Sequence, residues 1–382
     1  MVNADVVSET GNLTVDADND LSVNAAVATG GLGTIYLRSG NNINLDSQLA
    51  SASGDILVDS AANLNQTDLI TSTAGDVGLI AGGSLDQASS GDITTGGDVL
   101  LEAGADWTMS SGTEITAAGS VSGQALSGDL RLGLIDAADV GLIASDNIID
   151  GNAGSLNVSA DNLSLVSAGG SIGDHDNANG TPGQNGNAID IAVATLAADA
   201  DSGIYLSESD SVTITTVDRV IVDIESVVRV NFNSTTSSVG QSRGTSSLED
   251  LRTEIAGPIK LVSVAGSITI AGGSDGQGVS ASGSGDVLLE AAQDVTINAD
   301  VLSGSGNITL GAGNDLAVNS SVTTGGTGTV YLTSGNDTTI DSVLTTLSGD
   351  LLIDAGEDLT QNAAITSTAG DVGLIAGGSL DQ

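Results

Sequence analysis

Residues Gly306–Gly326 read GNITLGAGNDLAVNSSVTTGG, and the pattern of this stretch indicates the fold. Its apolar side chains alternate with small or polar ones in three short groups: Ile308 and Leu310, Leu316 and Val318, and Val322. Alternation with a period of two, broken by Gly, Asn, Asp and Ser, is typical of short strands with one buried face. A strand-plus-helix unit needs about 30 residues, so this stretch is too short for one. It therefore predicts one coil of a parallel β-helix.

The same pattern, which we call the beat, recurs in two runs, each at intervals of 21 or 22 residues. Each occurrence opens with a glycine, followed in most cases by Asp or Asn and then by a short apolar strand; the glycines are Gly11, Gly33, Gly54, Gly75, Gly97, Gly285, Gly306, Gly328, Gly349 and Gly370. Parallel crossovers are right-handed in nearly all proteins. We therefore expect an all-β fold, a right-handed parallel β-helix with about 21–22 residues per coil and an inserted side element.

A longer repeat contains these coils. Residues 1–87 align without a gap on residues 296–382, and the final stretch, ITSTAGDVGLIAGGSLDQ, is identical in Ile70–Gln87 and Ile365–Gln382. The chain thus holds one 295-residue unit and the first 87 residues of the next. Because Met1 falls in the middle of a repeat, we expect the chain to be a segment of a longer array.

Composition excludes several classes of function. The chain carries 49 acidic and seven basic residues, a net charge of −42, and no cysteine. Binding to nucleic acid or to anionic lipid needs clustered Lys and Arg, so neither is expected. No disulfide framework or thiolate metal site is available. The longest apolar runs are far shorter than the roughly 20 residues that span a bilayer, so we expect no membrane insertion.

The beat is interrupted twice, which divides the chain into five parts. We expect coils over 1–172, a polar loop insertion over 173–188, coils over 189–217, a projecting hairpin or side element over 218–260, and coils over 261–382. Five of the seven basic residues fall in 218–260, together with the single phenylalanine. These residues are the candidate partner contacts: Arg219, Arg229, Phe232, Arg243, Arg252 and Lys260.

The chain resembles the filamentous-haemagglutinin-type adhesins, which are large repetitive bacterial exoproteins. The residues that carry the resemblance are the glycine beat, GSIGD at Gly170–Asp174, IDIAVATLAADADSGIYLSESDSVTI at Ile189–Ile214, and Val217–Ile268 with its closing GSITI strand. The resemblance implies an extracellular or cell-surface location and a fibre that bridges cells or surfaces. Expected partners are copies of this chain, through head-to-tail or lateral filament contacts, and cell-surface glycans or proteins.

Two groups of acids are candidate calcium ligands, because a hard cation prefers several oxygen ligands close together. They are Asp16, Asp18 and Asp20, and Asp174 with Asp176. No other cofactor is expected. Most remaining acids recur beside turn glycines, and a position repeated at every coil is structural. The lone His175 lies in the polar insertion without an evident catalytic partner. We therefore expect a structural, adhesive protein and no enzyme.

Two alternatives stay open. A carbohydrate-active or carbohydrate-binding β-helix would need a single acidic groove near residues 170–260, because such sites require clustered acids at one coil position. A calcium-loaded matrix polymer would need cation sites along the chain.

Overall fold

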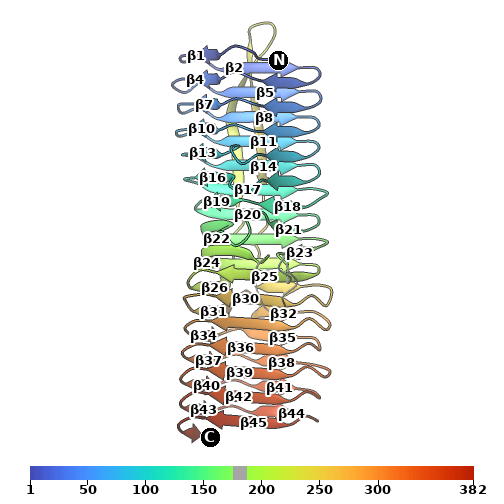
Figure 1. Cartoon of the computed structure of the whole chain (residues 1–382), viewed down its shortest axis with the longest axis vertical. Coiled ribbons are helices and arrows are strands. Elements are labelled where there is room, and N and C mark those ends of the chain that lie inside the picture. The colour runs from blue at the N-terminus through green and yellow to red at the C-terminus, as the bar shows by residue number, and fades with distance from the viewer. Residues whose placement is uncertain (175–186) are drawn as a thin grey trace. The chain divides into compact units, whose positions relative to one another are not determined.

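A computed structural model describes residues 1–174 and 187–382, and every regular element in these ranges is a strand. The strands pair in parallel and stack as a β-solenoid of about 17 turns (Figure 1). This arrangement confirms the parallel β-helix that the sequence predicts. The described ranges accordingly contain no helix with the length and apolar character that crossing a membrane requires.

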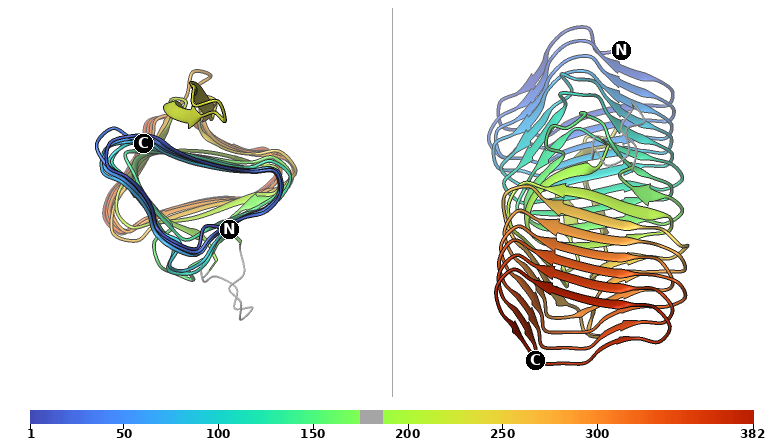
Figure 2. Two further views of the ribbon diagram at one scale, coloured as in Figure 1. Left: turned by 90° about the horizontal axis from the view of Figure 1, so that it is seen from above. Right: turned by 60° about the horizontal axis from the view of Figure 1, so that its bottom comes forward.

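The chain divides into two compact units. Unit 1 contains Met1–Asp161 and Arg219–Ser246, and unit 2 contains Asn162–Asp218 and Ser247–Gln382. The strand β22 (Val158–Ser167) begins in unit 1 and ends in unit 2. In each unit most coils contribute three short strands to three parallel sheets, and end-on the strands of a coil outline a triangle (Figure 2). The long strand β24 (Ile189–Ala200) instead pairs with strands of all three sheets of unit 2.

The first sheet of unit 1, which we call the docking sheet, consists of β2 (Leu13–Ala17), β5 (Ile35–Ser39), β8 (Ile56–Ser60), β11 (Val77–Ala81), β14 (Val99–Ala103), β17 (Ser120–Ala125) and β20 (Asp139–Ala144). The second consists of β3 (Leu21–Val23), β6 (Ile43–Leu45), β9 (Leu64–Gln66), β12 (Leu85–Gln87), β15 (Trp107–Met109), β18 (Leu130–Leu132) and β21 (Ile148–Asp150). The third consists of β1 (Val6–Ser8), β4 (Val27–Thr29), β7 (Leu49–Ser51), β10 (Ile70–Ser72), β13 (Ile93–Thr95), β16 (Glu114–Ala117) and β19 (Leu134–Asp136).

Unit 2 repeats the plan. One sheet contains β23 (Ser171–Ile172), β25 (Gly203–Glu208), β30 (Ile259–Ser263), β33 (Val287–Ala291), β36 (Ile308–Ala312), β39 (Val330–Ser334), β42 (Leu351–Ala355) and β45 (Val372–Ala376). Another contains β26 (Val212–Thr215), β31 (Ile268–Gly272), β34 (Val295–Ile297), β37 (Leu316–Val318), β40 (Thr338–Ile340), β43 (Leu359–Gln361) and β46 (Leu380–Asp381). The last contains β24 (Ile189–Ala200), β29 (Leu251–Thr253), β32 (Gln277–Ala281), β35 (Asp300–Ser303), β38 (Val322–Thr324), β41 (Leu344–Thr346) and β44 (Ile365–Ser367).

The register in which successive strands pair explains the interval of 21 or 22 residues. Ile35 of β5 lies opposite Leu13 of β2 and Ile56 of β8, so equivalent residues of successive coils stack at intervals of 22 and 21 residues. Within β5, Ile35 and Leu37 point into the coil and are fully buried. Stacked aliphatic side chains of this kind fill the interior and stabilise the fold by removing apolar surface from water.

The beat glycines stand where successive coils approach each other too closely for a side chain. A Cβ placed on Gly54 would lie 2.1 Å from the carbonyl oxygen of Gly33, and one on Gly349 would lie 2.0 Å from that of Gly328. No other residue fits at such a distance. The interval between glycines is therefore set by the stacking of the backbone.

The acids beside these glycines form a ladder between coils. A carboxylate oxygen of Asp55 accepts the backbone N–H of Asp76 at 3.0 Å, and Asp350 accepts that of Asp371 at 2.8 Å. Carboxylates that accept backbone hydrogen bonds stabilise turns. These acids therefore serve the fold.

The side element is shorter than the range 218–260 that the sequence indicates. The antiparallel hairpin consists of β27 (Ile221–Val230) and β28 (Thr236–Gly244), while β29 and β30 belong to the solenoid. The hairpin also does not project along its length as expected, since it packs across successive strands of unit 1 (Figure 1). It packs there because one of its faces is apolar. Of the predicted polar insertion 173–188, residues 175–186 lie outside the described ranges.

Candidate functional site

The hairpin crosses the outer face of the docking sheet and covers a row of apolar side chains there. Tyr36, Leu57, Ile80 and Leu100 occupy outward positions on successive strands, yet none is more than 8% exposed. They form one cluster with three buried residues of β27 and one partly buried residue of β28: Val222, Ile224, Val227 and Val239. Burying an aliphatic side chain of this size contributes about 1.5–3 kcal/mol, so the cluster is the main attachment of the hairpin.

Hydrogen bonds fix the hairpin at several coils. The backbone N–H groups of Val228 and Val230 donate to the hydroxyls of Thr34 and Thr14 at 3.0 and 2.8 Å. Near the other end, the Gln124 side-chain amide donates to the Gly244 carbonyl at 3.3 Å. The partners are separated by 120 to 216 residues in sequence. The hairpin thus ties together coils from β2 to β17.

Gly78 provides the space for this contact. A Cβ added to Gly78 would lie 2.5 Å from Cδ1 of Ile224 and 2.9 Å from Cδ1 of Leu57. Because these two side chains lie on opposite sides of the hairpin–sheet contact, neither can move freely. The glycine in the middle of β11 is therefore a requirement of docking.

Two of the predicted contact arginines bind within the molecule. Arg229 pairs with Asp16 at 2.5 Å, with side chains 39% and 27% exposed, and Arg243 pairs with Glu102. Arg38 also reaches Asp16, at 3.3 Å. These pairs attach the hairpin to the docking sheet, so Arg229 and Arg243 are occupied on that sheet.

The other predicted contact residues are scattered. Phe232 is fully exposed at the hairpin tip, and Arg219 is exposed before β27. Arg252 lies on β29 and pairs with Glu254 of the same turn, while Lys260 lies on β30. The structure therefore brings together Arg229 and Arg243 on one hairpin, and leaves Phe232 facing solvent.

The predicted calcium ligands that the structure describes make other contacts or face solvent. Asp16 pairs with arginines, and Asp18 is exposed. Asp20 accepts hydrogen bonds from Asn41 and Asn42, and those from Asn42 hold its pKa below the ordinary value. Asp174 donates its backbone N–H to the Asn187 carbonyl at 2.9 Å. His175 and Asp176 lie outside the described residues.

A different group of acids does converge. Among the described residues, Glu249, Asp250 and Asp275 each place one carboxylate oxygen within 4.8 Å of the others. They line a pocket of about 220 Å³ in unit 2, together with Asp199 and Arg252. Burial, and then the negative charges of Asp275 and Glu249, raises the pKa of Asp250 to about 6. We call this group the acidic pocket.

Sequence reasoning missed the acidic pocket because its members belong to neighbouring coils. Leu251, next to Asp250, is in register with Val279, four residues after Asp275. The acids meet only because the two irregular coils that carry them stack on each other. The regular glycine pattern does not mark these coils in the sequence. The signal in the sequence is the adjacent pair Glu249-Asp250, which does not follow a glycine of the 21–22-residue pattern as the turn acids do.

Unit 2 also contains a buried acid that pairs with backbone. The carboxylate of Glu208 accepts the N–H groups of Val193 at 3.1 Å and Asp210 at 3.2 Å. Burial raises the pKa of Glu208 to about 7. This acid is enclosed within β25 and β24, so it stabilises a loop and does not face a ligand.

Comparisons with protein-family models, with curated proteins and with solved structures found no match to this chain.

Proposed function

We propose that the chain is a structural and adhesive repeat segment of a bacterial cell-surface or extracellular fibre. In this proposal, each 295-residue unit folds as stacked coils and carries one hairpin. The hairpin packs across the first coils of the same unit and holds them together. The observation that carries the proposal is the retention of the hairpin's docking residues in the second copy of the repeat.

The docking residues recur in the second copy at an offset of 295. Thr14, Thr34, Tyr36, Leu57, Gly78 and Ile80 correspond to Thr309, Thr329, Tyr331, Leu352, Gly373 and Ile375. All six pairs are identical. The first four lie among the 69 positions of which 34 differ, and the last two lie in the fully identical stretch. Outward-facing residues of a coil are under no pressure from its interior. Their retention therefore supports a role in binding a second hairpin.

The corresponding face of the second copy is uncovered. Leu352 is 36% exposed, whereas Leu57 at the equivalent position of the first copy is fully buried. A row of exposed apolar residues on a repeat unit favours association. The occupant that fits is a hairpin with the sequence of Arg219–Ser246, because the face of the second copy carries the same docking residues as the face of the first copy.

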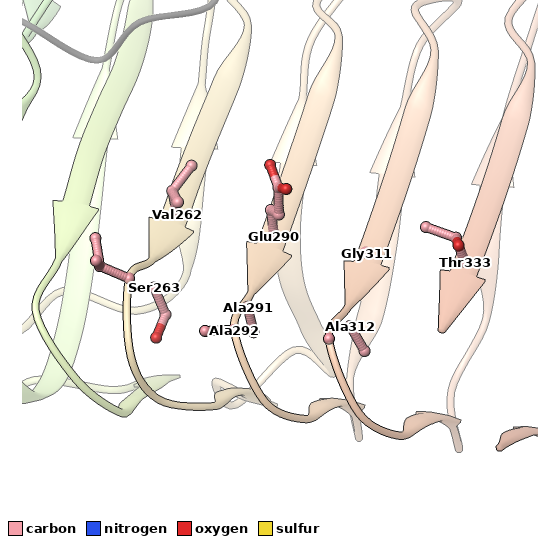
Figure 3. A pocket seen from close by; sticks show the side chains of 10 residues that line it. Val262, Ser263, Glu290, Ala291, Ala292, Gly311, Ala312 and Thr333 are labelled. Carbon is pink, nitrogen blue, oxygen red and sulfur yellow. The ribbon is translucent and has the colours of Figure 1, made fainter. Parts of the chain in front are cut away.

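Beside this row lies a shallow groove of about 480 Å³ that crosses β30, β33, β36 and β39 (Figure 3). Gly311 stands there at the position of Asp16, and Glu290 lies next to it in register (Figure 3). A second hairpin would carry an arginine at the position of Arg229. Glu290 offers that arginine a carboxylate in place of Asp16.

The proposed mechanism is mechanical and interfacial. Each hairpin would connect successive coils through side chains, in addition to the backbone ladders, and so stiffen the unit. Exposed hairpin tips, each with a phenylalanine at the position of Phe232, would present one contact per unit to surface glycans or proteins. Contacts repeated along a fibre gain strength through avidity. The net charge of −42 keeps neighbouring fibres soluble and apart.

The test extends the chain at its end by a second copy of residues 88–295, which completes the second unit. The chain has no cysteine, so Leu352→Cys introduces a single thiol whose labelling by a maleimide reports its exposure. We expect labelling at least about ten-fold slower in the extended chain than in the 382-residue chain. The control is the extended chain with its second hairpin replaced by a Gly-Ser linker, which should label at the original rate. Equal rates in all three chains would contradict the proposal.

The acidic pocket favours a second candidate, a carbohydrate-binding β-helix. Its acids and Arg252 lie in the non-repetitive part of unit 2, where such a groove was expected. Binding or depolymerisation of a neutral or acidic polysaccharide, lost on Arg252→Ala, would establish this candidate. The absence of both against a panel of polysaccharides would remove it.

A further inference from the structure

The acidic pocket contains a buried oxygen atom that has no hydrogen-bond partner among the described residues. This atom is Oδ1 of Asp250, a residue that is 6% exposed. A buried carboxylate oxygen without a partner costs several kcal/mol when charged, and it persists where something else satisfies it. Asp250 also has a left-handed backbone, with φ of +70°. The coil thus holds this side chain in the pocket at a conformational cost.

The two neighbouring acids are positioned by hydrogen bonds from the loop that contains Asp275. Glu249 accepts the backbone N–H of Ser274 at 2.7 Å and its hydroxyl at 3.1 Å. Asp275 accepts the backbone N–H and side-chain amide of Gln277 at 2.8 and 2.9 Å. Three carboxylates held within 4.8 Å repel one another strongly unless a positive charge lies between them.

The positive group that lines the pocket is already engaged. Arg252 directs its guanidinium to Glu254, outside the group of three carboxylates. Gly273 contributes space, because a Cβ there would lie 2.1 Å from an oxygen of Glu249. Asp275 is exposed and Glu249 half-buried, so water can reach the pocket and complete a coordination shell.

We propose that Glu249, Asp250 and Asp275 form a binding site for a divalent cation of the calcium class. Three carboxylates offer up to six oxygens, and calcium accepts six to eight oxygen ligands in irregular geometry, whereas magnesium requires a near-ideal octahedron. The Oδ1 atom of Asp250 would be the buried ligand, and the cation would join the turn before β29 to the turn before β32. This site is distinct from the hairpin and does not depend on the fibre role.

The test uses the full chain after treatment with a chelator, in 0.15 M KCl at pH 7.5, titrated with CaCl2 alone in a calorimeter. The salt suppresses diffuse binding to the many exposed acids. We expect one saturable site per chain, with a Kd on the order of 10⁻⁴ M, and weaker binding of MgCl2. Calcium should also raise the melting temperature of unit 2.

Asp250→Asn should weaken calcium binding at least about ten-fold and abolish the calcium-dependent rise in melting temperature, since a neutral amide is a poorer ligand. This variant should fold, because it removes a repulsive buried charge. Asp286→Asn removes one charge from a turn acid whose carboxylate accepts the backbone N–H of Asn307, and should leave calcium binding unchanged. The absence of a saturable site, or equal binding by wild type and Asp250→Asn, would overturn the proposal.

Discussion

Residues 1–87 and 296–382 carry the same outward-facing row of residues in two different environments. In the first copy Tyr36, Leu57 and Ile80 are buried beneath the hairpin, whereas in the second copy Leu352, the equivalent of Leu57, is exposed. The outward-facing apolar residues and the strand register are the same in both copies. The difference therefore shows that exposure on this face is set by a segment about 200 residues away in sequence.

The comparison also changes the interpretation of the basic residues. Clustered arginines on an acidic protein suggest an external partner, yet Arg229 and Arg243 bind acids of the docking sheet. Because the second copy has Gly311 and Thr333 where the first has Asp16 and Arg38, the ionic contacts vary between copies. The apolar residues do not vary, so they carry the binding.

The largest effect should follow removal of the hairpin. Val217 and Leu248 are paired by backbone hydrogen bonds of 2.7 and 3.0 Å, so a short Gly-Ser linker can replace residues 219–246 without separating their neighbours. Exposing the apolar cluster should cost unit 1 up to about 10 kcal/mol. Native-state hydrogen exchange should show lost protection in β5, β8 and β11 and unchanged protection in β39 and β42. Unchanged protection in unit 1 would contradict the account.

A smaller effect should follow a side chain placed between hairpin and sheet. Gly78→Val would force apart Ile224 and Leu57, and should destabilise unit 1 by about 1–3 kcal/mol. Gly373→Val is the matched control, because its added Cβ would meet only the movable end of Leu352, at 3.0 Å. It should change stability by less than about 0.5 kcal/mol. Denaturant unfolding of both variants gives the comparison, and equal losses would show that the hairpin does not dock tightly.

Acidification should change the stability of unit 2 through its buried acid, Glu208. The pKa of Glu208 is raised to about 7 by burial, so between pH 8 and pH 4.5 the folded state binds a proton more tightly than the unfolded state. Protonation of Glu208 should therefore stabilise unit 2 as pH falls, by at most about 1.4 kcal/mol per pH unit. Asp250, whose pKa is raised to about 6 by burial, should add to the slope at lower pH. Glu208→Gln should flatten this slope in melting experiments. A slope unaffected by the substitution would assign the effect to other acids.

The smallest effect should follow loss of the ion pair at the hairpin tip. Arg229→Ala removes a partly exposed contact with Asp16 and should cost at most about 1 kcal/mol, less at high salt. Arg252→Ala is a control of equal charge, because its pair with Glu254 lies away from the hairpin. If Arg229→Ala released the hairpin entirely, the ion pair and not the apolar cluster would carry the docking.

The coils could be predicted from the sequence because the residues that specify each strand and turn lie close together in the chain. Alternating Ile35 and Leu37 specify a strand with one buried face, and Gly54 marks a close approach of backbones that recurs at each coil. The hairpin was predicted as an element, since RVIVDIESVVRV from Arg219 to Val230 alternates. Its docking was not, because Leu57 resembles any outward residue of a strand. The acidic pocket was missed for a similar reason: Asp250 and Asp275 meet only after two irregular coils stack.

The most direct test of the central claim compares two single-cysteine variants of the same 382-residue chain, Leu57→Cys and Leu352→Cys. The two positions are equivalent in the repeat, and their maleimide labelling rates report how well each is covered. The account predicts labelling of Leu57→Cys at least about 100-fold slower than Leu352→Cys, with the difference abolished when residues 219–246 are replaced by a linker. Equal rates in the intact chain would contradict the claim that the hairpin covers only the first copy.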